Sequence, residues 1–143
     1  MAENIEARVL CREIADRALG GIAARLASKW AAVLLPTVSH AAIVSTAAAA
    51  DDAFETAKKT LFRMGTAVPE FPVRDRAREC TAVVGAGIGG LNPCLVHVKV
   101  TIAMRGSTIS LRAVAKEGLV RQATAEKAVT TISAALRSEL GEN

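Results

Sequence analysis

Two runs of alternating residues near the C-terminal end constrain the fold of this chain most. From Val96 to Met104 apolar residues alternate with polar or small ones, and the same period of two returns from Ser107 to Lys116. This period is typical of a strand with one buried face. Because only Arg105 and Gly106 separate the runs, the sequence predicts an antiparallel hairpin that turns at these two residues.

A two-residue loop would also fix the register of the hairpin, because it decides which residues face each other. Three apolar pairs would then share one face: Ile102 with Ile109, Val100 with Leu111, and Val98 with Ala113. On the other face Lys99 would lie directly opposite Arg112, with Lys116 further along. Opposed like charges destabilise a sheet, so this arrangement suggests an anionic partner.

Further elements complete an α+β domain. The pattern predicts strands over Ser39–Thr46 and Arg78–Val84 and helices over Asp51–Met64 and Ala123–Leu140. Strand, helix, three strands and helix then follow one another, which indicates an antiparallel sheet of about four strands. Both helices are expected on its apolar face, and the other face is expected to be open to solvent.

Each predicted helix has one apolar side. In the first, a single face carries Phe54, Ala57, Leu61 and Met64. In the closing helix the residues expected inward are Ala128, Val129, Ile132, Ala135, Leu136 and Leu140. Gly65 is well placed to end the first helix.

A helical segment precedes this domain. Apolar residues recur at helical spacing from Asn4 to Leu35, Gly20 and Gly21 interrupt the run as a hinge, and Pro36 ends it. The charged residues of its first half, Glu6 among them, are expected on a solvated face. We therefore expect residues 1–36 to form an N-terminal helical segment and residues 37–143 to form the α+β domain.

Composition limits the class of protein. The 143 residues are 51% hydrophobic and 22% charged, which suits one globular domain. Three cysteines, an odd number without dense spacing, favour a reducing cytoplasm. The run from Trp30 to Ala50 has no charged residue, yet it is rich in alanine and interrupted by Pro36. It is interpreted as a helix end followed by a buried strand, and membrane association through residues 22–50 is the alternative.

A glycine motif invites a nucleotide-binding interpretation that its context does not support. Val83–Leu91 contains G-x-G-x-x-G and resembles the fingerprint of Rossmann enzymes. That fingerprint needs a helix directly after its last glycine and an acidic residue roughly twenty positions on. Here Asn92 and Pro93 follow, and no Asp or Glu lies between Glu79 and Glu117. The glycines are therefore interpreted as a turn or bulge between strands, and no cofactor is expected.

Basic residues form the candidate binding site. In an extended chain Arg74, Arg76 and Arg78 would project to one side. Together with the cations of the hairpin they give the candidate anion-binding set Arg74, Arg76, Arg78, Lys99, Arg112 and Lys116. Solvated side chains that keep the open face soluble are the simpler interpretation of the same pattern. The chain has no tyrosine and its aromatic residues look like core residues, so sequence-specific RNA binding is not expected.

Catalytic and metal-binding patterns are weak. Neither His40 nor His97 has a nucleophile and an orienting acid at a defensible spacing, so no catalytic residue is assigned. Cys80, Cys94 and His97 would supply three metal ligands at most, where a structural zinc site needs four. Free thiols are favoured over a disulfide between Cys80 and Cys94. The sequence favours a protein that is not an enzyme and binds no metal.

Two functional hypotheses follow. In the first, the protein is a binding or interaction module that associates with itself, through the open sheet face or the N-terminal helix. Its partner would be another copy, another protein or an apolar small ligand. In the second, the basic sheet face binds nucleic acid or acidic lipid, helped by a formal net charge of +4.

Overall fold

The computed structural model describes residues 2–17, 31–86, 92–117 and 122–142. The elements run in the order α1 (Ala2–Arg17), β1 (Thr37–Thr46), α3 (Ala50–Met64), β2 (Gly65–Ala67), β3 (Glu79–Ala86), β4 (Asn92–Ile102), β5 (Ser107–Lys116) and α4 (Thr124–Glu139). Residues 31–34 are also helical. The predicted α+β class with an N-terminal helix is confirmed.

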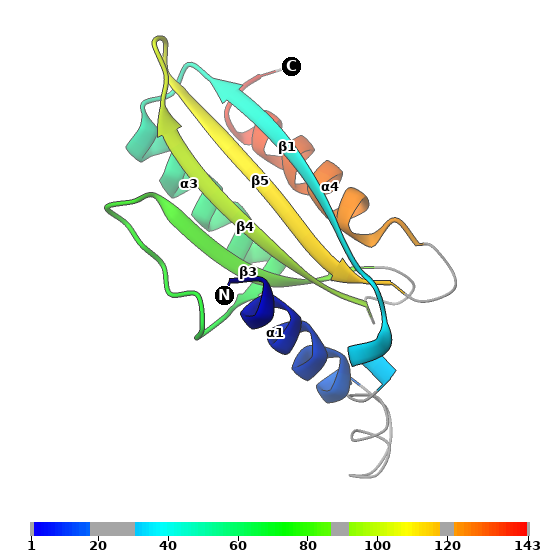
Figure 1. Cartoon of the computed structure of the whole chain (residues 1–143). Coiled ribbons are helices and arrows are strands. Elements are labelled where there is room, and N and C mark those ends of the chain that lie inside the picture. The colour runs from blue at the N-terminus through cyan, green and yellow to red at the C-terminus, as the bar shows by residue number, and fades with distance from the viewer. Residues whose placement is uncertain (1, 18–30, 87–91, 118–121, 143) are drawn as a thin grey trace.

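The strands form one antiparallel sheet of five strands in the order β1-β5-β4-β3-β2 (Figure 1). The predicted sheet had about four strands, and the additional one is β2. Gly65 ends helix α3 as expected, but the chain continues there in an extended conformation and pairs with β3. Three residues are too few for an alternating pattern to mark a strand in the sequence.

Helices α3 and α4 cover one face of the sheet, as predicted, and lie behind it in Figure 1. The main hydrophobic core fills this layer. Phe54, Ala57 and Leu61 of α3 are buried in it together with Ile132 and Leu136 of α4. These are the helix faces that the helical spacing indicated.

The opposite face is not open along its whole length, as the sequence analysis expected. Helix α1 packs on it, where Val9 and Leu10 form a second core cluster with Val83, Leu95 and Val114 (Figure 1). At this end of the sheet consecutive strand residues are apolar, so both faces need a cover. The predicted hinge at Gly20 and Gly21 lies outside the described residues.

The uncharged run ends in an edge strand. Residues 31–34 form a helical turn and β1 follows Pro36. The expectation of a buried strand is wrong, because most side chains of β1 are exposed and only Val44 and Thr46 are buried. An edge strand has a neighbour on one side only. Among the described residues, no helix combines the length and apolar character needed to cross a membrane.

The β4–β5 hairpin exists, but its register differs from the prediction by two residues. Val100 faces Ile109 and Val98 faces Leu111, and the loop comprises residues 103–106. The Ala103 amide donates to the Gly106 carbonyl across 3.1 Å. A shift of two residues keeps every side chain on its predicted face, so the apolar pattern is satisfied by either register.

Candidate functional site

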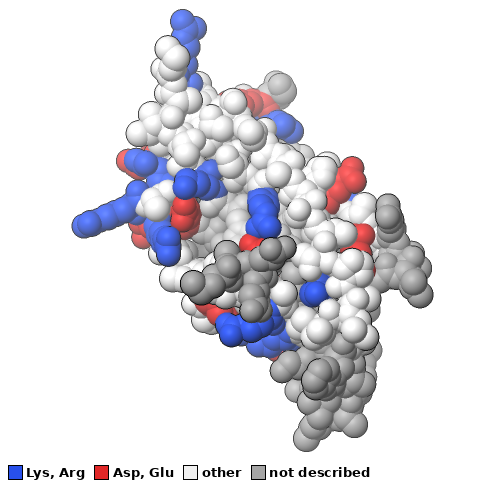
Figure 2. Space-filling view, in the orientation of Figure 1, with Lys and Arg blue, Asp and Glu red and all other residues white. Residues whose placement is uncertain are grey.

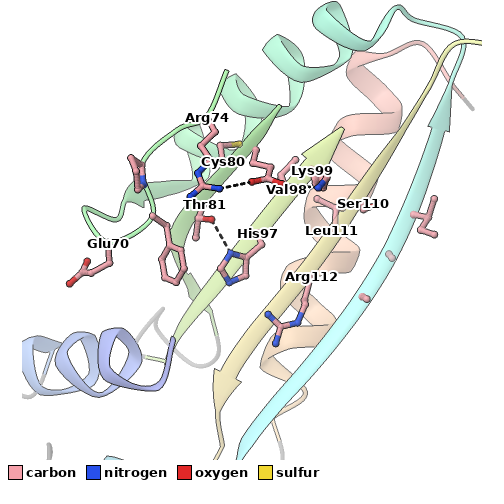
Figure 3. Close-up of a pocket in the computed structure, with 16 residues that line it drawn as sticks. Glu70, Arg74, Cys80, Thr81, His97, Val98, Lys99, Ser110, Leu111 and Arg112 are labelled. Carbon is pink, nitrogen blue, oxygen red and sulfur yellow. Dashed lines mark hydrogen bonds and ion pairs between the residues drawn. The ribbon is translucent and has the colours of Figure 1, made fainter. Parts of the chain in front are cut away.

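The sheet face that α1 partly covers carries an open groove of about 580 Å³. Its floor comes from strands β1, β3, β4 and β5, and the segment that contains Phe71 and Pro72 forms a wall. Figure 3 shows His97 and Arg112 on neighbouring strands of the floor, with helix α1 at the lower left. Its polar lining includes Thr81, Lys99 and Ser110.

Glu6 of α1 anchors the polar floor next to the groove. Its side chain is 7% exposed, and both carboxylate oxygens accept hydrogen bonds from the Arg112 guanidinium, at 2.6 and 3.2 Å. His97 Nε2 lies 3.0 Å from Glu6 Oε1, in a close contact that falls outside hydrogen-bond geometry. The salt bridge therefore ties α1 to strand β5 and neutralises a carboxylate that burial alone would destabilise.

His97 is held from several sides. Its Nδ1 lies 2.9 Å from the Thr81 hydroxyl, and its ring packs edge-on against Phe71, with centroids 5.1 Å apart. Burial lowers the pKa of His97 below its ordinary value, against the opposing effect of Glu6. The imidazole is therefore neutral near neutral pH, and it can donate from one ring nitrogen while it accepts at the other.

Thr81, His97 and Glu6 stand in the order of a nucleophile, a base and an orienting acid. Thr81 is only 6% exposed and lies within strand β3, so its hydroxyl is better placed to orient His97 than to reach a substrate. Arg112 already holds both oxygens of Glu6, which weakens that carboxylate as a partner for an imidazolium. These contacts of Thr81 and Glu6 therefore suit the positioning of the His97 ring.

Lys99 and Arg74 share one carboxylate at the upper end of the groove. Lys99 Nζ lies 2.8 Å from one oxygen of Glu79, and Arg74 lies 3.7 Å from the other. The hydrogen bond from Lys99 lowers the pKa of Glu79 below its ordinary value. The two cationic side chains are 55% and 69% exposed and Glu79 is 33% exposed, so the positive groups face the solvent more fully.

The wall segment is fastened to α1 by a second ion pair. Arg12 donates to the carboxylate of Glu70, and this hydrogen bond lowers the pKa of Glu70. Phe71, the next residue, packs against the second core cluster and also lines the groove. Helix α1 thus supports the wall and the floor of the groove together.

The structure brings three of the six predicted anion-binding residues to the groove: Arg74, Lys99 and Arg112. Lys99 faces Ser110 across the strands and Arg112 faces His97, so the predicted opposition of Lys99 and Arg112 is wrong. The error follows from the two-residue shift of the hairpin. Both side chains still lie on one face of the sheet.

The other three predicted residues lie elsewhere. Lys116 is 6% exposed and donates to the carbonyl of Leu35, and Arg78 donates to Asp51 at the start of α3. Arg76 is exposed in a turn that the paired residues Arg74 and Glu79 close. The extended chain expected over these arginines is therefore wrong, because residues 75–78 form the turn and Arg78 has a φ of 52°.

The cysteines do not meet His97. Cys80 and Cys94 are free thiols buried in the main core, whereas His97 projects from the opposite face of the sheet. Burial raises the pKa of Cys80 to about 11 and that of Cys94 to about 12, which keeps both protonated and unreactive. Among the described residues, no three His, Cys, Asp or Glu side chains cluster as metal ligands would.

The glycine motif joins antiparallel strands. β3 and β4 pair as far as Ala86 with Asn92, with Gly85 opposite Pro93, whereas the Rossmann fingerprint joins a strand to a helix. Gly87 and Gly90 lie outside the described residues. The antiparallel pairing agrees with the interpretation of this motif as a connection between strands.

Sequence reasoning missed Glu6 and Thr81. Glu6 was expected on a solvated face, yet Glu6 and Leu10 are four residues apart and so share one face of α1. An acid at helical spacing from apolar residues is a signal that it meets a basic partner where the helix packs. Thr81 had no comparable signal, since threonine is common in strands.

Comparison with known proteins gives little beyond this geometry. No protein-family model matches the chain, and no curated protein matches it. Among solved structures, the di-domain aromatase/cyclase StfQ from the steffimycin biosynthetic pathway is similar, with 14% identity and a TM-score of 0.40. The match covers 85% of this chain and 61% of that one, so this chain spans less than two thirds of StfQ.

Proposed function

We propose that the protein is a non-catalytic binding module whose ligand is a small molecule with an apolar ring and an anionic group. The groove supports this proposal, because it has a volume of about 580 Å³ and combines an apolar wall with cationic side chains. Ligand sites of roughly 300–1,000 Å³ with a few polar groups are typical of small-molecule binding.

The exposure of the charged side chains carries the proposal. Arg112 is 48% exposed while Glu6 is 7% exposed, and Lys99 is also more exposed than Glu79. Figure 2 shows Lys and Arg atoms gathered on this side of the molecule, with fewer Asp and Glu atoms among them. An anionic group in the groove would meet the donors, because the carboxylates that balance them lie deeper.

The apolar part of the ligand would lie against the wall. Phe71 and Pro72 face the groove from one side and Ile43 of β1 from another. Ile43 is 65% exposed, so a ligand that covered it would gain free energy by removing apolar surface from water. Neutral His97 would add a hydrogen-bonding group between the apolar wall and the cationic side chains of the groove.

The test uses a matched pair of probes, 2-naphthoate and neutral 2-naphthamide, titrated into the full chain by isothermal calorimetry. We expect 2-naphthoate to bind at a single site, about tenfold tighter than 2-naphthamide, because one charge-assisted hydrogen bond is worth about 1.5 kcal/mol. Lys99→Met should remove this preference, and Ser110→Trp should block both probes by filling the groove. Lys59→Met removes an exposed cation from α3 on the other side of the sheet and should leave binding unchanged.

Equal affinities for the two probes would contradict the anionic part of the proposal. Binding that survives Ser110→Trp would contradict the site itself. Lys99→Met and Ser110→Trp should first be shown to unfold as cooperatively as the unmodified protein, so that lost binding reports on the groove.

The alternative function, binding of nucleic acid or acidic lipid through a basic sheet face, would use a larger set of cations. The buried amine of Lys116 and the Arg78–Asp51 pair leave fewer cations for that face. Titration of duplex DNA and of anionic vesicles at low salt distinguishes the two functions. A polyanion site would weaken steeply as salt rises, with several counterions released.

A further inference from the structure

The two edges of the sheet are very different in length. β2 forms one edge with three residues, and β1 forms the other with ten. An edge strand presents unpaired backbone groups that another strand can bind, and proteins commonly keep such edges short. The β2 edge is protected in this way and the β1 edge is not.

The register shows which residues of β1 present those groups. The Glu117 amide donates to the Pro36 carbonyl across 3.1 Å, one step beyond the end of the β1–β5 ladder. In an antiparallel ladder alternate residues bond to the partner strand, so the even-numbered residues of β1 bond to β5. The backbone groups of the odd-numbered residues point outward: Thr37, Ser39, Ala41, Ile43 and Ser45.

These outward residues are all exposed, and the sheet formed by the described residues places no strand against them. Charged residues and proline, which commonly protect an edge strand, are absent from β1. Residues 37–46 include no Lys, Arg, Asp, Glu or Pro. A strand without charge can pair with its own copy without placing like charges opposite each other.

We propose that β1 pairs with β1 of a second copy of this chain, antiparallel and around a two-fold axis, so that two five-stranded sheets become one. The odd-numbered residues supply the hydrogen bonds, and in a register centred on Ala41, Ser39 faces Ile43 of the second copy. The next pair in the same register is Val38 with Val44, an apolar match. This closed two-fold contact uses the same residues on both copies and leaves no free long edge.

The pairing also has a consequence for the groove. A two-fold axis perpendicular to the joined sheet keeps the same face of both copies on one side. Ala41 and Ile43 line the groove, so the two grooves would lie next to each other across the new strand pair. The self-association itself does not depend on any ligand.

The test is the mass of the full chain by sedimentation velocity, from about 1 to 500 μM. We expect a species of twice the 14.9 kDa chain mass at the higher concentrations. Ser39→Lys with Ser45→Lys should give a monomer, because it places lysines of both copies along the contact. Thr66→Lys with Thr101→Lys adds the same charge at exposed strand positions away from β1 and should leave the dimer intact.

A second variant and a second measurement cover a failure of the lysine variant to fold. Ala41→Pro removes only an outward amide and should also give a monomer. Hydrogen exchange of the unmodified protein should slow at the Ser39, Ala41 and Ile43 amides as concentration rises. A monomer throughout the range, or a dimer that persists in both β1 variants or leaves those amides unprotected, would overturn the proposal.

Discussion

Glu6 links three parts of the molecule through one carboxylate. Burial of a charged group is costly unless a partner compensates it, and here the two nitrogens of Arg112 do so. Removal of Glu6 or of Arg112 breaks this bidentate ion pair, so the two residues should behave as a unit. The packing of α1 on the floor of the groove and the position of His97 both depend on this ion pair.

The coupling between Glu6 and Arg112 can be measured by a double-mutant cycle. We expect Glu6→Ala to lower the free energy of unfolding by about 2 kcal/mol, with a coupling of about 1 kcal/mol to Arg112→Ala. The more exposed pair of Arg12 and Glu70 is the matched control, and its coupling should be about 0.5 kcal/mol or less. Urea unfolding of the single and double variants tests both values, and equal couplings would show that burial of Glu6 adds nothing.

His97 predicts how stability depends on pH. Because burial lowers its pKa in the folded protein, the unfolded chain takes up a proton more readily as the solution is acidified. The contribution of His97 to the free energy of unfolding is therefore complete above its ordinary pKa of about 6.5, and it is lost as pH falls below that value.

The measurement is urea unfolding at several pH values between about 7.5 and 5.5. His97→Asn, which keeps a polar group near Thr81, should flatten the fall in stability over this range. His40→Asn replaces an exposed histidine and should keep the fall. An unchanged slope in His97→Asn would assign the pH dependence to other groups.

At the scale of elements, the β4–β5 turn depends on one glycine. Gly106 has a φ of 91°, and a Cβ atom at this position would lie 2.0 Å from the carbonyl oxygen of Thr46. The turn therefore packs closely against the end of β1, where Ser107 also donates to the Ala48 carbonyl. This contact closes the end of the β1–β5 ladder, where Thr46 faces Ser107.

Gly106→Ala should lower the free energy of unfolding by about 2 kcal/mol or more, since it adds a steric clash to the cost of a left-handed backbone. Gly141 is the matched control, because its φ is 71° and a Cβ there would meet nothing within 4 Å. Gly141→Ala should cost about 1 kcal/mol. Thermal unfolding of both variants tests the difference, and equal losses would contradict the close contact.

The sequence could predict the elements and their faces but not every contact between them. Alternation shows which side chains share a face, and the helices α3 and α4 lie where that pattern indicated. It leaves the hairpin register open, because a shift of two residues changes no face. The arginines near Arg76 show a related limit, since their alternation has meaning only in an extended chain and the structure forms a turn there.

The candidate site was harder to predict than the fold. Lys99 and Arg112 were identified as cations of one face, and both line the groove. Their balancing acids come from distant positions, Glu6 in α1 and Glu79 in β3. The Glu6 pair depends on how α1 packs on the sheet, and the Glu79 pair depends on the register of β3 against β4. No local pattern in one sequence specifies either.

At the scale of the whole molecule, the two faces of the sheet are covered differently. Its helical face is filled by α3, α4 and the main core, while α1 covers only part of the other face. The groove lies on that second face, between the wall segment and strand β1. The main core can therefore stay fully packed while the candidate groove on the opposite face remains open.

The most direct test of the proposed ligand groove is a map of backbone amide shifts during titration of ¹⁵N-labelled protein with 2-naphthoate. The largest changes should fall on groove residues of the floor and wall, such as Phe71, His97, Lys99 and Ser110, and helices α3 and α4 should change little. Changes concentrated on α4, or equal affinities for 2-naphthoate and neutral 2-naphthamide in this titration, would contradict a groove that selects an anionic ring.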